Sequence, residues 1–134
     1  MTCLANEGFQ TLDARLSYPL PEEPLEALLA MAVRTWEFML DNTQMYRLMN
    51  GMDGIALNPE MMRAAAWQLC SSVNVVVRRF VDETVPDVEV SALTDQLWAL
   101  LHGMASLYLD RSAPFEVHRV REATRRLLTG QTGT

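Results

Sequence analysis

The chain has 134 residues, 49% hydrophobic and 21% charged, which fits one globular domain with a single core. Its net charge of −6 argues against DNA binding by this chain alone, because phosphate neutralisation needs a basic surface. No apolar run approaches the ~20 residues of a membrane span, and the N-terminus does not resemble a secretory signal. Cys3 and Cys70 are too far apart for metal-ligand spacing and are typical of reduced thiols in a cytoplasmic protein.

The charge is unevenly distributed along the chain. Residues 1–110 hold 6 arginines and 15 acidic residues, a net charge of −9, whereas the last 24 residues hold 5 arginines and 2 glutamates, a net charge of +3. A basic C-terminal helix could bind nucleic acid or acidic lipid. A solvated helix face whose cations complement the helix C-terminus is the more usual explanation, and we adopt it.

The chain is expected to be all helical, because no segment combines the two-residue alternation and β-branched enrichment of a strand. The first helix is expected over residues 4–16, and three prolines then disfavour helix over residues 18–24. The second helix is expected over residues 24–41, with Pro24 in its first turn and glutamates that complement the positive end of its dipole.

Four further helices are expected. Asn42 and Thr43 end the second helix and cap a short third helix over residues 44–50. The other three are expected over residues 59–82 with Asn58 as N-cap, over residues 90–110, and from a cap at Ser112 to Gly130. Short connections favour an antiparallel bundle of about six helices. We therefore expect one domain over residues 1–130 and a disordered tail over residues 131–134.

Methionine is frequent, with nine in the chain, and six of them lie between residues 39 and 62 among aromatic side chains. Methionine is flexible and polarizable, so methionine-rich surfaces accept varied apolar partners. This segment indicates an adaptable pocket for an apolar or aromatic small molecule. Residue types alone favour the alternative, an ordinary helical core in which methionine is a filler.

Metal binding and catalysis lack a supporting motif. The two histidines, His102 and His118, lie on different expected helices, so the sequence shows no metal-ligand spacing. Ser106 follows His102 by four residues, and Cys70 adjoins two serines, but neither makes a recognised nucleophile and base. We expect no metal, no cofactor and no enzymatic activity.

The last two expected helices carry more apolar surface than one domain of this size can bury. A two-fold homodimer, with two helices from each copy in a four-helix bundle, would cover the rest, and a self-contained monomer is the alternative. The expected interface residues are Leu97, Leu101, Met104, Tyr108, Val120, Leu127 and Leu128.

One motif in the fifth expected helix is unusual. Trp98 and His102 lie four residues apart, so they share a helix face, and Gly103 follows them. A glycine inside a helix costs about 0.5–1 kcal/mol relative to alanine, which suggests close approach of another backbone or a ligand. The Trp-x-x-x-His-Gly pattern resembles the C-terminal regulatory domain of one branch of the TetR-type bacterial transcription regulators.

The resemblance to this family extends over nearly the whole chain. Its other parts are Glu-Gly-Phe at residues 7–9, the helix ending at Asn42, Tyr-Arg-Leu-Met-Asn-Gly at residues 46–51, and the long helix after Pro59. Asn50 departs from the branch, which usually has an aromatic residue there. The resemblance implies an all-helical domain that binds a small molecule and dimerises. It also implies that DNA is contacted only through an N-terminal helix-turn-helix domain, which is missing here, joined through residues 1–16.

We therefore interpret the chain as the ligand-binding and dimerisation domain of a cytoplasmic TetR-type repressor with an apolar or aromatic effector. A freestanding helical interaction or small-molecule-sequestering module is the alternative. His102 would offer the effector an oriented polar contact. The candidate ligand-binding residues are Trp36, Met39, Leu40, Met45, Tyr46, Met49, Trp67, Cys70, Trp98 and His102.

Overall fold

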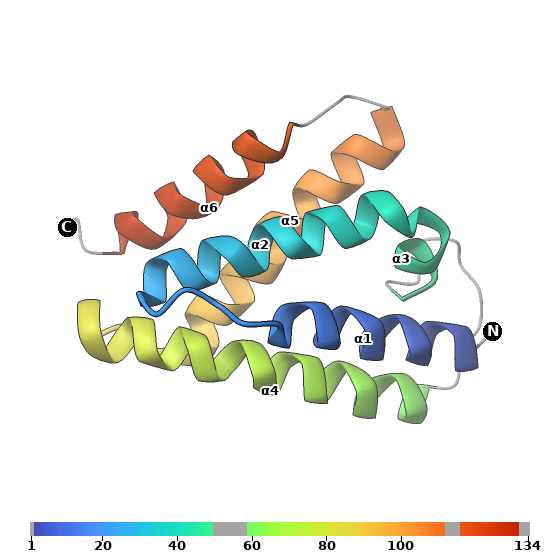
Figure 1. The fold of residues 1–134 in the computed structure, drawn as a ribbon, viewed down its shortest axis with the longest axis horizontal. Helices are drawn as coiled ribbons and strands as arrows, with labels where there is room; N and C mark the ends of the chain where they lie inside the picture. The colour runs from blue at the N-terminus through green and yellow to red at the C-terminus, as the bar shows by residue number, and fades with distance from the viewer. Residues whose placement is uncertain (1, 50–58, 112–115, 132–134) are drawn as a thin grey trace.

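The computed structural model describes residues 2–49, 59–111 and 116–131, and within these ranges every regular element is a helix (Figure 1). The helices are α1 (Thr2–Ser17), α2 (Pro24–Asp41), α3 (Thr43–Met49), α4 (Pro59–Thr84), α5 (Val90–Arg111) and α6 (Val117–Gly130). The expected all-helical bundle of six helices is confirmed. Among the described residues, no helix is long and apolar enough to cross a membrane.

The boundaries of α2 follow from local chemistry. Pro24 occupies the first turn, where its missing N–H needs no partner, and the Glu23 carboxylate accepts hydrogen bonds from the backbone N–H groups of Leu25 and Glu26. At the other end Asn42 is the C-cap, and its backbone N–H donates to the carbonyl of Phe38. The predicted range of residues 24–41 is therefore confirmed at both ends.

Other boundaries differ from the sequence expectation. The last helix begins at Val117 with Glu116 as its N-cap, so the expected cap at Ser112 is wrong. The Glu116 side chain makes no capping hydrogen bond, and instead lies 3.0 Å from Nδ1 of His118. The fourth helix continues to Thr84, two residues beyond the expected end. The expected N-cap Asn58 lies outside the described residues.

Helix α2 is the centre of the bundle, because it contacts all five other helices. Figure 1 shows α6 along one side of α2, with α1 and α4 side by side on the other. The largest fully buried side chains include Trp36 and Phe38 from α2 and Phe80 from α4. Truncating such an aromatic to alanine typically costs 3–5 kcal/mol, so these contacts determine how the helices are placed.

The C-terminal end of α1 is fixed to α2 by one arginine. Arg34 donates to the carbonyl oxygens of Tyr18 at 2.7 Å and Pro19 at 2.8 Å, and also to that of Arg15 at 3.3 Å. Carbonyls at and just beyond a helix end have no partner within the helix, so a guanidinium satisfies them well. Arg15 itself packs over the ring of Phe38. These contacts position the next residue, Leu16, at the cavity described below.

Candidate ligand cavity

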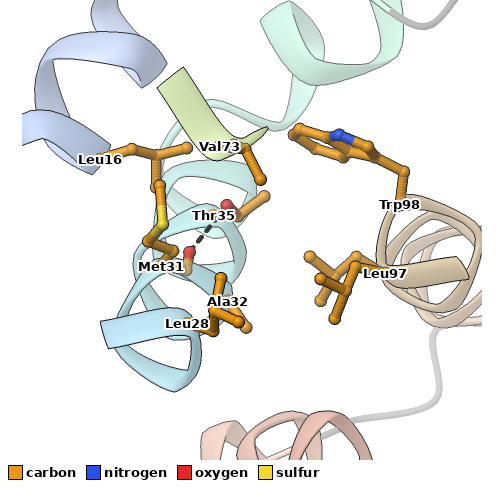
Figure 2. Close-up of a pocket in the computed structure, with 9 residues that line it drawn as sticks. Leu16, Leu28, Met31, Ala32, Thr35, Val73, Leu97 and Trp98 are labelled. Atoms are coloured by element: carbon orange, nitrogen blue, oxygen red, sulfur yellow. Dashed lines mark hydrogen bonds between the residues drawn. The ribbon is translucent and has the colours of Figure 1, made fainter. Parts of the chain in front are cut away.

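An apolar cavity lies where four helices meet. Figure 2 shows Leu97 and Trp98 of α5 facing the side chains of α2 across it, with Val73 of α4 at one edge. Helix α1 contributes Leu16. The described lining residues are Leu16, Leu28, Met31, Ala32, Thr35, Val73, Leu97, Trp98 and Leu101.

The cavity is small in this structure. Its volume is about 30 Å³, room for roughly one water molecule, whereas pockets for drug-sized ligands measure about 300–1,000 Å³. A ligand larger than a few atoms would therefore require movement of the lining side chains. Side chains from four different helices would have to move apart, so occupation of this cavity is coupled to helix packing.

The polar atoms in the lining are few, and none of the nine described side chains is charged. The Thr35 hydroxyl donates to the carbonyl of Met31, one turn earlier, at 2.8 Å (Figure 2). Trp98 is half-buried, but its indole Nε1 is fully buried and has no hydrogen-bond partner. A buried donor without a partner costs about 1–3 kcal/mol, so this indole N–H is an uncompensated feature of this structure.

Among the ten ligand-binding candidates from the sequence, Trp98 lines the cavity. Trp36, Met39 and Tyr46 are buried elsewhere in the core, and the Trp36 ring meets Tyr108 edge-on with centroids 5.7 Å apart. Met45 is half-buried and packs against the same core. Among the methionines of the methionine-rich segment, the two whose side chains are described, Met39 and Met45, are therefore not among the lining residues.

Two further candidates lie at the surface of the single chain. Leu40 is 40% exposed, and His102 is exposed, so neither reaches the cavity from its own helix. The side chains of Met49, Trp67 and Cys70 lie outside the described residues. Their assignment to a ligand site remains a prediction.

Sequence reasoning missed most of the lining. Leu16, Leu28, Met31, Ala32, Thr35 and Val73 were not among the candidate ligand-binding residues, and Leu97 and Leu101 were assigned to a dimer interface. Thr35 offered a usable signal, because it is a polar residue on the otherwise apolar inner face of α2 and is buried. No comparable signal marks the aliphatic residues, which look like ordinary core.

The expected interface residues divide into two groups. Val120 and Leu128 are 0% exposed and Leu97 and Leu101 are nearly buried, so these four side chains pack within the single chain. Met104, Tyr108 and Leu127 are half-buried and retain accessible surface. The outer side of α5 also exposes Leu107, 42% accessible. The participation of these residues in a dimer remains a prediction.

The described residues give no reason for glycine at position 103. A Cβ atom added to Gly103 would have no described neighbour within 4 Å, so none of the described parts of the chain makes the expected close approach. His102 and Gly103 lie together on the exposed side of α5.

Helix α6 is joined to α2 by a cluster of charged groups. Glu26 accepts from Nη2 of Arg121 at 2.8 Å and from Nη2 of Arg125 at 3.4 Å, which uses two arginines of the basic C-terminal segment. Among the described residues, no group of three or more histidine, cysteine, aspartate or glutamate side chains could hold a metal ion.

The six helices form an all-helical bundle, and four of them line a small apolar cavity. The chain belongs to the family of tetracyclin repressor-like C-terminal domains, whose family model matches residues 27–130. The resemblance of the Trp98–His102–Gly103 motif is thereby confirmed at the level of the family, and such domains are regulatory. No curated protein and no solved structure gives a significant match.

Proposed function

We propose that this chain is the effector-binding and dimerisation domain of a bacterial, cytoplasmic TetR-type repressor, with a small apolar or aromatic effector bound in the α1–α2–α4–α5 cavity. The observation that carries the proposal is a cavity lined by four helices in a chain of this family. Contact with an operator would be made by a helix-turn-helix domain, as in the regulators that the chain resembles.

The position of Leu16 supports a regulatory role for the cavity. Leu16 lies on α1, the helix that in this interpretation leads to the DNA-binding half, and its side chain is part of the lining. A ligand that needs more than the present 30 Å³ binds only to conformations in which the lining has separated. By stabilising those conformations, the ligand shifts the position of α1 relative to α2 and α4.

Dimerisation through the outer face of α5 is part of the proposal. The accessible parts of Met104 and Tyr108, together with exposed Leu107, form an apolar area that a second copy would cover. The open space around Gly103 allows the backbone of a second copy to approach closely. These features favour an isologous pairing of α5 with α5 of the second copy.

A thermal-shift screen of apolar and aromatic compounds tests the proposed function. A compound at 100 times its dissociation constant should stabilise the fold by about 2.7 kcal/mol. Ala32→Val should reduce or abolish the shift, because Ala32 lines the cavity and the added methyl groups fill it. Ala30→Val is the matched control, since Ala30 lies on the same helix and is not among the lining residues.

Two results of this screen would contradict the proposal. A broad set of such compounds that leaves the melting temperature unchanged would remove the effector-binding role. Shifts that persist unchanged in Ala32→Val would mean that the effector site lies elsewhere in the domain.

A further inference from the structure

The chemistry of the lining restricts which molecules the cavity can bind. The nine described lining side chains carry no charge, and their surface is almost wholly carbon. Moving an ionised group into such a site without a counter-charge is strongly unfavourable. A charged effector therefore has no partner in this part of the site.

Two of the lining side chains, Thr35 and Trp98, can donate a hydrogen bond, and only one of these donors already has an acceptor. The Thr35 hydroxyl proton is already used, because it is donated to the carbonyl of Met31 at 2.8 Å. The Nε1–H of Trp98 is buried and has no acceptor. Among the nine described lining side chains, the indole is thus the hydrogen-bond donor that remains uncommitted.

We propose that the effector is an uncharged, mainly apolar molecule with a hydrogen-bond acceptor, such as a carbonyl oxygen, that receives the Nε1–H of Trp98. This inference rests on the proposed function and identifies the ligand class for the same cavity. An acceptor at the indole would remove the cost of the unpaired donor, which a hydrocarbon of the same shape could not do.

Trp98 is well placed for this role by its position on α5. Figure 2 shows its indole reaching from α5 toward Val73 and Thr35, so it forms one wall of the cavity. Being half-buried, the side chain is less confined than the core aromatics, and it can adjust when the cavity opens. Because Nε1 is itself buried in this structure, the proposal requires the indole to turn its N–H toward the ligand when the cavity opens.

Three probes of one shape test the inference: indane, indanone and indanecarboxylate. We expect indanone to bind the full chain about tenfold more tightly than indane, which corresponds to one hydrogen bond to an otherwise unpaired buried donor. Indanecarboxylate should bind more weakly than either. In ¹H–¹⁵N spectra, indanone should shift one indole N–H resonance, the one that disappears in Trp98→Phe, and indane should not produce the same shift.

Two variants assign the contact. Trp98→Phe should bind indane and indanone about equally, because an aromatic wall is kept, although a smaller one, and the donor is lost. Thr35→Val should keep the preference for indanone, since the hydroxyl proton is already committed to Met31. If Trp98→Phe does not fold, sequential assignment of the three indole N–H resonances in the unmodified chain identifies that of Trp98 and decides the question.

The outcomes separate the inference from the proposed function. Equal binding of indane and indanone, tighter binding of indanecarboxylate, or a preference lost in Thr35→Val but kept in Trp98→Phe would overturn the inference and leave effector binding intact. If none of the three probes binds although other compounds stabilise the domain, the ligand class is again wrong. If no compound of any kind binds, the proposed function fails, and the inference fails with it.

Discussion

Replacement of Leu97 by alanine should destabilise the domain and enlarge the cavity at the same time. Leu97 is 7% exposed, so nearly all of its side chain is removed from water. The substitution deletes three carbons, each worth about 0.8 kcal/mol, or about 2.4 kcal/mol in transfer free energy. The hole left behind adds about 1 kcal/mol, so we expect a loss of about 3–4 kcal/mol.

The new space distinguishes this site from the rest of the core. Because Leu97 borders an existing cavity, its truncation should merge the two spaces and allow indane to bind more tightly than it binds the unmodified chain. Leu93→Ala is the matched control, since Leu93 is fully buried on the same helix and is not among the lining residues. It should lose similar stability but leave a hole separate from the cavity.

Urea unfolding at one fixed protein concentration measures the stability loss, and titration with indane measures the gain in binding. A stability loss below about 1 kcal/mol for Leu97→Ala would refute the argument from burial. An equal gain in indane affinity for both variants would refute the argument that Leu97 borders a distinct ligand site.

Three further predictions concern other parts of the molecule. Leu107→Glu should convert the dimer to a monomer in sedimentation while the fold is retained, because the new charge would be buried at the interface without a partner. Val75→Glu, at a 63% exposed position on α4, is the control and should leave the dimer intact. A wild-type chain that sediments as a monomer at tens of micromolar would refute the dimer. Burial raises the pKa of Tyr46 to about 12, so the folded state favours neutral tyrosine, and this contribution to stability is complete below pH 10 and lost as the pH rises toward 12. Tyr46→Phe should remove this part of the alkaline loss in unfolding measurements, and Tyr18→Phe, at an exposed position, should not. Glu26→Gln should lower the free energy of unfolding by at most about 1 kcal/mol, because Glu26 and both arginine partners are about 40% exposed to solvent. The loss should be smaller in high salt, and a loss independent of salt would show that the pairing is not electrostatic.

The helices were predictable because their ends carry local signals. Pro24 and Asn42 mark the limits of α2 in the sequence and in the structure. The end of α6 at Gly130 was also predicted, but its start was not, because Ser112 is a good cap by residue type and the helix begins five residues later. Local preference gives the possible caps, and packing decides which one is used.

The faces of the helices were harder to predict than their ends. Helix α5 is apolar on several sides, with leucines at positions 93, 97, 100, 101, 107 and 109. Such a pattern predicts a helix but does not determine which side faces the interior. Leu97 and Leu101 border the cavity together with residues of α2, and His102 is exposed, which the sequence pattern did not predict. Only contacts with the other helices fix that rotation.

The hydrogen bonds from Arg34, called the Arg34 clamp below, fix the C-terminal end of α1 as the point about which this helix would tilt. Its C-terminal end is held by three hydrogen bonds from Arg34, and Leu16 reaches the cavity at that same end. The 16 residues of α1 span roughly 24 Å at 1.5 Å per residue, so a tilt of about 10° around the Arg34 clamp would displace the far end by about 4 Å. If the proposed effector shifts Leu16 by a few tenths of an ångström, the N-terminus of α1 would move severalfold further. The size of that movement would depend on the length of α1 and on the position of Arg34 near its C-terminal end.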